Sequence, residues 1–166
     1  MSTALQALAT RGINFFIAQG DWGADDASYV GNSSYYPDGN SYVMYPGSDP
    51  SVISCGGTML GELNPHPPPK YLEWVWSDAW SNPPAPFPQY NWGATGGGVS
   101  KTFSAPSYQT AAGVTGATDS TMVPRVGRGV PDIAGMVAYS GVADGVWFYV
   151  NGQQYPYTGT SCVAPL

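Results

Sequence analysis

Short apolar runs alternate along this chain with long polar stretches that are rich in glycine and proline. Residues 3–11 place apolar side chains on one stripe at helical spacing, and Gly12 follows where a left-handed residue commonly ends a helix. Residues 13–18 form a short, mostly apolar run, which is typical of a strand in a parallel sheet covered on both faces. The pattern predicts a helix that leads directly into a buried strand.

The remaining apolar runs predict further strands and one short helix. Residues 24–50 are polar and full of turn-forming residues, so they predict a long surface excursion. A hairpin is predicted where two aromatic runs, 146–150 and 154–157, are separated by Asn151-Gly152-Gln153. The alternation of helices with buried strands indicates an α/β layered sheet. The other predicted elements are a buried strand over 51–58, an aromatic strand over 71–76, a short helix from Pro106 and a strand entered through 130–135.

Charged side chains are scarce, at 10% of the 166 residues against about 25% in typical soluble proteins. Five basic residues face eleven acidic ones, and the net charge of -6 argues against a nucleic acid or an anionic membrane as a partner. A protein with so few ionisable groups is also suited to an acidic environment, because little charge accumulates on it as the pH falls. No apolar run reaches the roughly 18 residues of a membrane span, and the first residues do not show the basic region followed by an apolar region that is typical of a secretion signal.

The last eight residues, Gly159–Leu166, predict the nucleophile turn of a serine peptidase. A serine that follows Gly-Thr and opens a helix has an exposed hydroxyl, and its own backbone N–H points toward an incoming oxyanion. Ser161 is therefore the candidate attacking residue. The alternative is an N-cap serine that only ends a loop. Because the helix predicted from Ser161 stops at Leu166, we expect residues 1–166 to be a single, partial domain.

Asp21 is the second candidate residue, because it follows the first predicted strand in a glycine-rich turn, where open α/β sheets place functional groups. Its alternative role is an Asx turn or a helix N-cap. Asp25 and Asp26 follow closely but lack the spacing of an EF-hand. His66 is the only histidine, and its place inside a proline run does not position it as a general base for Ser161.

Five motifs stand in order along the chain: Phe16–Asp21, Pro50–Thr58, Gly96–Gln109, Arg128–Gly135 and Gly159–Pro165. Together they resemble the sedolisin family of serine-carboxyl peptidases, and its kumamolisin-like bacterial members most closely. The resemblance implies a subtilisin-like α/β fold, a three-layer structure in which a parallel sheet is flanked by helices. It also implies acid-active hydrolysis of peptide bonds by the C-terminal part of a catalytic domain that is incomplete at both ends.

By this resemblance, Ser161 matches the family's nucleophile and Asp21 matches the aspartate that stabilises the oxyanion. A carboxylic acid donates a hydrogen bond only in its neutral form, so activity should fall once Asp21 ionises. The family's general base is a glutamate, oriented by an aspartate one helical turn later, on a helix upstream of the matching segment. Glu62 and Glu73 do not match this pair, since neither has an Asp four residues on.

Several positions carry no assigned chemistry. Trp22 and Thr158 depart from the family's pattern, which has a small residue and a glycine there, and we expect both to reshape the site. The family's calcium site lies beyond the nucleophile helix, past Leu166, so no metal-binding or cofactor-binding residue is assigned in this chain. Cys55 and Cys162 lack metal spacing and predict two small buried thiols, with their pairing left open.

The expected function is that of an acid-acting serine-type endopeptidase with a polypeptide substrate. The resemblance implies that it is secreted or works in an acidic compartment. An upstream chain or segment is expected to supply the Glu/Asp base, so this chain alone is expected to be inactive. The alternative is a non-catalytic sedolisin-like protein that lacks this base and whose aromatic residues, 14% of the chain, form an interaction surface.

Overall fold

The computed structural model describes residues 2–24, 42–64, 70–77, 93–114, 127–139 and 145–166. Its strands are β1 (Phe16–Ala18), β2 (Ile53–Asn64), β3 (Lys70–Val75), β4 (Gly98–Val99), β5 (Gly129–Val130), β6 (Ile133–Tyr139), β7 (Val146–Val150) and β8 (Gln153–Tyr157). Its helices are α1 (Ser2–Ala9), α2 (Ser107–Ala111) and the 3-10 helix η3 (Thr160–Cys162). Every element predicted from the apolar runs is present, although several bounds differ.

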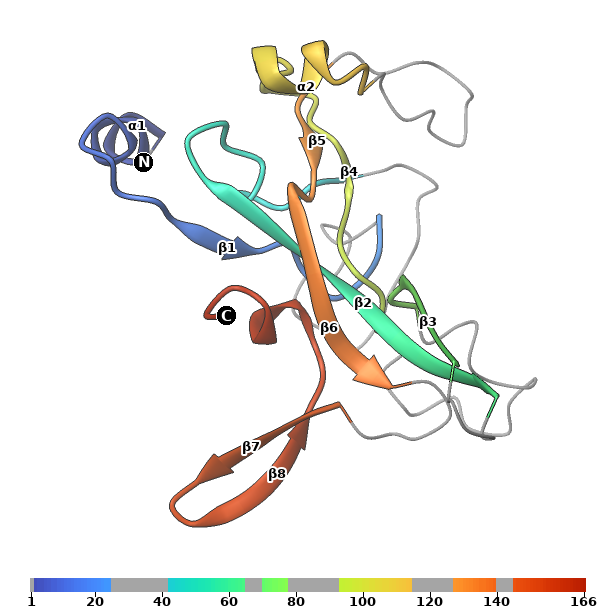
Figure 1. The fold of residues 1–166 in the computed structure, drawn as a ribbon. Coiled ribbons are helices and arrows are strands. Elements are labelled where there is room, and N and C mark those ends of the chain that lie inside the picture. The colour runs from blue at the N-terminus through green and yellow to red at the C-terminus, as the bar shows by residue number, and fades with distance from the viewer. Residues whose placement is uncertain (1, 25–41, 65–69, 78–92, 115–126, 140–144) are drawn as a thin grey trace.

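The longest strand, β2, forms the centre of the main sheet and pairs along both of its edges (Figure 1). β1 and β6 run parallel to it, with Ala18 and Ile133 each opposite Cys55. β3 pairs antiparallel with the later part of β2. Because β3 and β6 both pair with residues 58–60 of β2, they lie on opposite edges of that strand. β1 and β6 both pair with Cys55, so β1 lies on the same edge of β2 as β3.

The parallel pairing of β1, β2 and β6 confirms the predicted α/β class. The aromatic strand β3 departs from an all-parallel sheet, because few residues separate it from β2 and a short connection reverses the chain. The helix α1 ends at Ala9, and Gly12 has a φ of 76°, as expected for the residue that terminates a helix. None of the helices in the described ranges is long and apolar enough to cross a membrane.

The core lies between the main sheet and the C-terminal turn. Cys55 and Met59 are separated by an even number of residues on β2, so both side chains point to the same face. On β6, a Cβ atom at Gly135 would approach Cγ1 of Val163 to 3.1 Å. The sheet therefore packs closely against the turn that follows β8. The buried cluster consists of Cys55, Met59, Trp76, Val137, Cys162 and Val163.

A buried ion pair joins the peripheral elements to this sheet. Arg128 is fully buried, and its Nη2 lies 2.6 Å from Oδ2 of Asp132 and donates to the Val52 carbonyl at 3.0 Å. Its Nη1 donates to the hydroxyl of Tyr108 on α2. The backbone N–H of Ser54 completes the cluster by donating to Asp132 Oδ2 at 2.8 Å. These contacts offset the cost of burying the guanidinium charge and connect α2, β2 and the start of β6.

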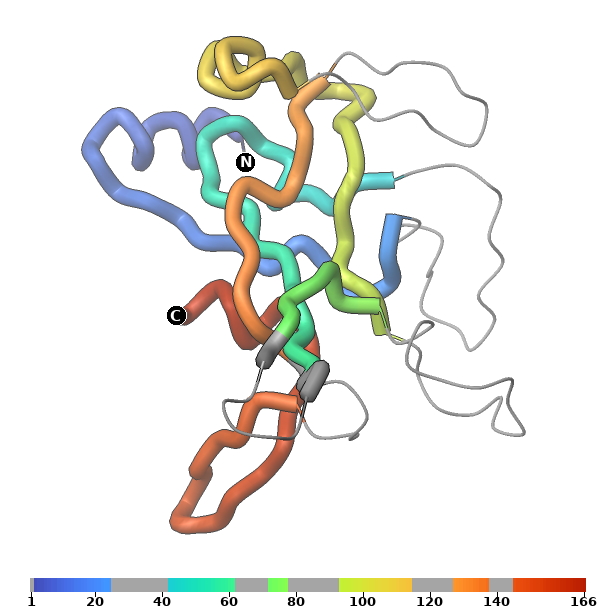
Figure 2. The backbone as a smooth tube through the Cα atoms, turned by 45° about the vertical axis from the view of Figure 1, so that its right-hand side comes forward, coloured from blue at the N-terminus to red at the C-terminus, as the bar shows by residue number. Residues whose placement is uncertain are grey.

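The hairpin β7–β8 projects away from the main sheet (Figures 1 and 2). Its loop consists of Asn151 and Gly152, whose φ angles of 53° and 78° fit a two-residue type I′ turn. The predicted hairpin is confirmed, but its loop is shorter than expected, because Gln153 already belongs to β8. Tyr149 and Tyr157 are 74% and 62% exposed, so the ribbon carries aromatic side chains into solvent.

Candidate active site

Asp21 lies in a turn that directly follows β1. The preceding residue, Gly20, has a φ of 105°, in the region that favours glycine. The backbone N–H of Gly96 donates to the Gly20 carbonyl at 2.8 Å, and that of Ala94 donates to the Asp21 carbonyl at 2.8 Å. These two bonds fix the backbone from which the Asp21 side chain projects, at the carboxyl end of a parallel strand.

Ser161 lies in a tight turn after β8. Gly159 has a φ of 133°, and η3 begins at the next residue. The Cys162 N–H donates to the Gly159 carbonyl at 3.0 Å, which closes the turn. Thr160 and Cys162 are buried, whereas Ser161 between them is exposed. Within the described parts of the chain, neither the hydroxyl nor the backbone N–H of Ser161 has a hydrogen-bond partner, so both can meet a substrate.

The two turns meet through Thr160. Its backbone N–H donates to Oδ1 of Asp21 at 2.7 Å, and its hydroxyl lies 2.9 Å from the same oxygen. The structure thus brings Asp21 against the residue immediately before Ser161, although the two candidates lie near opposite ends of the sequence. The sequence motif includes Thr160, but nothing in its local pattern indicates this contact.

The two thiols beside the site are poor nucleophiles. Burial raises the pKa of Cys162, and the negative charge of Asp21 raises it further. Burial also raises the pKa of Cys55, and the charge of Asp132 adds to this, while a backbone hydrogen bond from Ile17 opposes it. Both cysteines are buried, as the sequence predicts, and the structure shows that they are free. Because the thiolate is the reactive form, the exposed hydroxyl of Ser161 is the better candidate nucleophile.

No protein-family model matches the chain. It is 38% identical over 168 residues to tripeptidyl-peptidase sed5 of Aspergillus fumigatus, an alignment that covers 100% of this chain and 26% of that protein. It is 33% identical over 170 residues to kumamolisin of a Bacillus species, with 100% and 25% covered. Among solved structures it is similar to Pseudomonas sedolisin, a serine-carboxyl proteinase complexed with two molecules of pseudo-iodotyrostatin. That likeness has a TM-score of 0.67 and 29% identity, and it covers 99% of this chain and 38% of the other.

The resemblance to the sedolisin family is confirmed. With it the subtilisin-like fold is confirmed, because the likeness to sedolisin extends over nearly the whole chain. The chain spans about a quarter of the length of the curated relatives it matches, so the similarity extends over one part of those proteins.

The two departures from the sedolisin family's pattern lie close to the site. The backbone of Trp22 pairs with Ala94 in a parallel bridge, and its side chain is half-buried. Thr158 is also half-buried, directly before Gly159. The backbone hydrogen bonds that Asp21 and Gly159 accept form although Trp22 and Thr158 are the neighbouring residues.

Among the described residues, no other sequence candidate joins Asp21 and Ser161. Glu73 is exposed on β3, where its Oε1 accepts a hydrogen bond from the Thr58 hydroxyl at 2.6 Å. Asp25, Asp26 and His66 lie outside the described residues, as does the side chain of Glu62. In the described ranges, no group of three or more His, Cys, Asp or Glu side chains is arranged to hold a metal ion.

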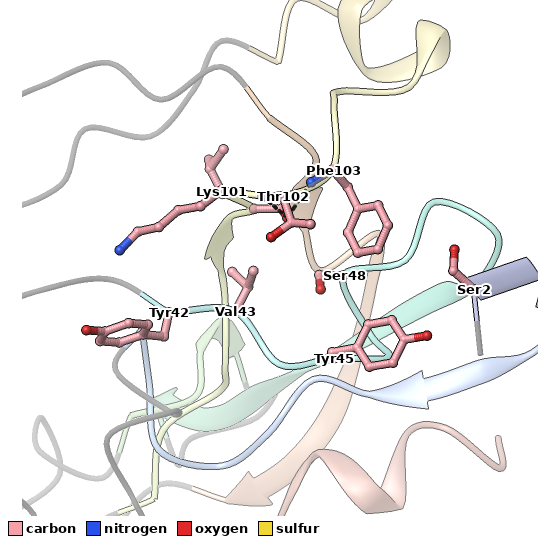
Figure 3. Close-up of a pocket in the computed structure, with 10 residues that line it drawn as sticks. Ser2, Tyr42, Val43, Tyr45, Ser48, Lys101, Thr102 and Phe103 are labelled. Atoms are coloured by element: carbon pink, nitrogen blue, oxygen red, sulfur yellow. Dashed lines mark hydrogen bonds between the residues drawn. The ribbon is translucent and has the colours of Figure 1, made fainter.

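A cavity of about 490 Å³ opens near β4, away from the nucleophile turn (Figure 3). Its wall includes the stacked rings of Tyr45 and Phe103, whose centroids are 6.3 Å apart. Lys101 also lines it, with its Nζ 4.6 Å from the centroid of the Tyr42 ring. Neither Asp21 nor Ser161 belongs to the lining, so this cavity is a feature separate from the candidate site.

Proposed function

We propose that this chain forms part of the catalytic domain of an acid-acting serine-type endopeptidase, with Ser161 as nucleophile and Asp21 as oxyanion stabiliser. The observation that carries the proposal is the contact of Asp21 with Thr160, next to the exposed Ser161. An exposed hydroxyl can attack a carbonyl, and a neutral carboxyl in contact with its turn can donate a hydrogen bond to the oxyanion that forms. The confirmed similarity to sedolisin-family peptidases supports the same reaction class.

In the proposed reaction, Oγ of Ser161 attacks the carbonyl carbon of the substrate peptide bond. The serine proton passes to a general base, and the carbonyl oxygen becomes an oxyanion that accepts hydrogen bonds from the Ser161 N–H and from the neutral Asp21 carboxyl. When the intermediate collapses, the protonated base gives its proton to the leaving amine, and water later hydrolyses the acyl-enzyme. The requirement for a neutral Asp21 is the reason for acid activity.

The general base is proposed to come from another segment or chain. In the described part of the protein no carboxyl other than Asp21 contacts the turn of Ser161. β1 pairs with β2 along one edge, and Phe16 on β1 is 47% exposed, so this side of the sheet offers a place for the complementary segment. That segment would carry the Glu/Asp pair, and calcium would be bound by residues beyond Leu166. A polypeptide substrate and a secreted or acidic location complete the proposal.

The test is proteolysis by the complete protein that contains this chain. It should cleave a denatured protein substrate between about pH 3 and 5, where ordinary carboxyl groups titrate. Ser161→Ala should abolish cleavage, because the attacking oxygen is lost. Ser104→Ala is the matched control, since Ser104 is exposed and distant from the turn in sequence, and it should cleave normally. Equal turnover by wild type and Ser161→Ala would overturn the assignment.

The second candidate function is a non-catalytic binding protein with the same fold. The exposed aromatic side chains of the β7–β8 hairpin, Tyr149 and Tyr157, favour it. Such a protein should keep its full function in the Ser161→Ala variant. The same pair of proteins therefore separates the two candidates.

A further inference from the structure

Thr160 is fully buried, and its hydroxyl contacts only the turn that carries Asp21. The Gly20 N–H donates to Oγ1 of Thr160 at 3.1 Å. The same Oγ1 lies 3.1 Å from the Gly20 carbonyl and 2.9 Å from Oδ1 of Asp21. A hydroxyl has one proton, so it can donate to one of these two oxygens at a time.

We propose that Thr160 is a positioning residue that determines which oxygen of Asp21 carries the acid proton. This inference rests on the proposed function. Oδ1 accepts a hydrogen bond from the backbone N–H of Thr160 at 2.7 Å. A proton on Oδ1 would therefore point toward the hydrogen of that N–H group, and the two donors would repel each other. The neutral carboxyl therefore carries its proton on Oδ2. Thr160 holds Oδ1 in place and leaves the Oδ2–H group to donate to the oxyanion.

The position of Gly159 supports the same assignment. Oδ2 of Asp21 lies so close to Gly159 that a Cβ atom built on this residue would be 2.7 Å away. Oδ2 thus occupies the space beside the turn that carries Ser161, while Oδ1 is occupied by Thr160. The two oxygens of one carboxyl have different surroundings, and only Oδ2 has no hydrogen-bond partner among the described residues.

The test compares Thr160→Val with Thr160→Ser in the complete protein, by measuring kcat and KM across the pH range. The valine variant keeps the shape of threonine but has no hydroxyl. Its kcat should fall about 10- to 100-fold, because the Oδ2–H group is no longer held in place, and KM should stay within about twofold. The serine variant should retain both the rate and the pH profile of the wild type.

Two further variants keep the result interpretable. In an Asp21→Ala background, Thr160→Val should lower kcat no further, since no carboxyl remains to be held in place. Thr160→Ala removes the same hydroxyl with less steric demand and replaces the valine variant if that one does not fold. An unchanged kcat, or a fall of the same size in the Asp21→Ala background, would overturn the role of Thr160 while wild-type activity still supports the proposed function. An inactive wild type would overturn both.

Discussion

Gly159 and Asp21 are in such close contact that no larger residue fits at position 159. A Cβ atom on Gly159 would lie 2.7 Å from Oδ2 and 3.3 Å from Oδ1 of Asp21. The φ of Gly159, 133°, is also one that L side chains rarely adopt. Space and backbone conformation therefore require glycine at this position, and the requirement comes from the candidate oxyanion donor.

Gly159→Ala should reduce kcat of the complete protein by about 100-fold, because the added methyl group displaces the Asp21 carboxyl from its position. Gly113→Ala is the matched control. Gly113 also has a positive φ, 68°, but a Cβ atom there meets nothing within 4 Å. The control should lose about 1–2 kcal/mol of stability to backbone strain and keep its activity. Equal activity of the two variants would contradict the proposed place of Oδ2.

Asp21→Asn should change the pH profile of kcat/KM. An amide donates a hydrogen bond at any pH, so activity should persist above the acid range in which the wild type works. Asp21→Ala removes the donor altogether and should lose about 100- to 1000-fold in rate. The measurement is kcat/KM across the pH range for all three proteins. If the acid and alkaline limbs of the pH profile of Asp21→Asn coincide with those of the wild type, Asp21 is not the oxyanion donor.

Asp132→Asn should destabilise the folded protein by about 3–5 kcal/mol, because it leaves the fully buried Arg128 without its counter-charge. The free energy of unfolding is measured by urea denaturation, well above the ordinary aspartate range of about pH 4. Tyr108→Phe is the control, since it keeps both charges and removes only the hydroxyl that accepts from Arg128 and donates to Asp132, on a residue that is 53% exposed. It should cost about 1 kcal/mol. Similar losses of unfolding free energy in both variants would show that the charge of Asp132 adds nothing to stability beyond its hydrogen bonds.

Cys55 and Cys162 should resist alkylation until the protein unfolds, because burial keeps both thiols neutral and covered. Their raised pKa values also predict a loss of stability in alkali. In the unfolded chain thiols ionise near about pH 8.5, whereas in the folded protein they stay neutral to higher pH. Their stabilising contribution is complete below that pH and is lost as the pH rises through the folded pKa values.

Labelling with iodoacetamide and peptide mapping check the prediction, and Cys55→Ala serves as the control that removes one site. Rapid labelling of either cysteine in the native protein would contradict it.

The local pattern of the sequence predicted most of the secondary structure. The left-handed glycine that follows α1, Gly12, and the presence of the hairpin depend on a few neighbouring residues, and the structure confirms both. The orientation of β3 and the burial of Arg128 were not predicted. Each depends on which distant segment packs beside it, and apolar spacing carries no such information.

The features of the candidate site also divide into those that the sequence determined and those that the tertiary structure decided. The sequence alone determined the candidates, because Ser161 follows Gly-Thr at the start of a turn and Asp21 follows a buried strand in a glycine-rich turn. Only the tertiary structure decided that Thr160 joins them, since parallel pairing of β1 with β2 and packing of η3 on the same sheet bring the two turns together. Such a contact between distant segments arises from the packing of the sheet, which no local spacing encodes.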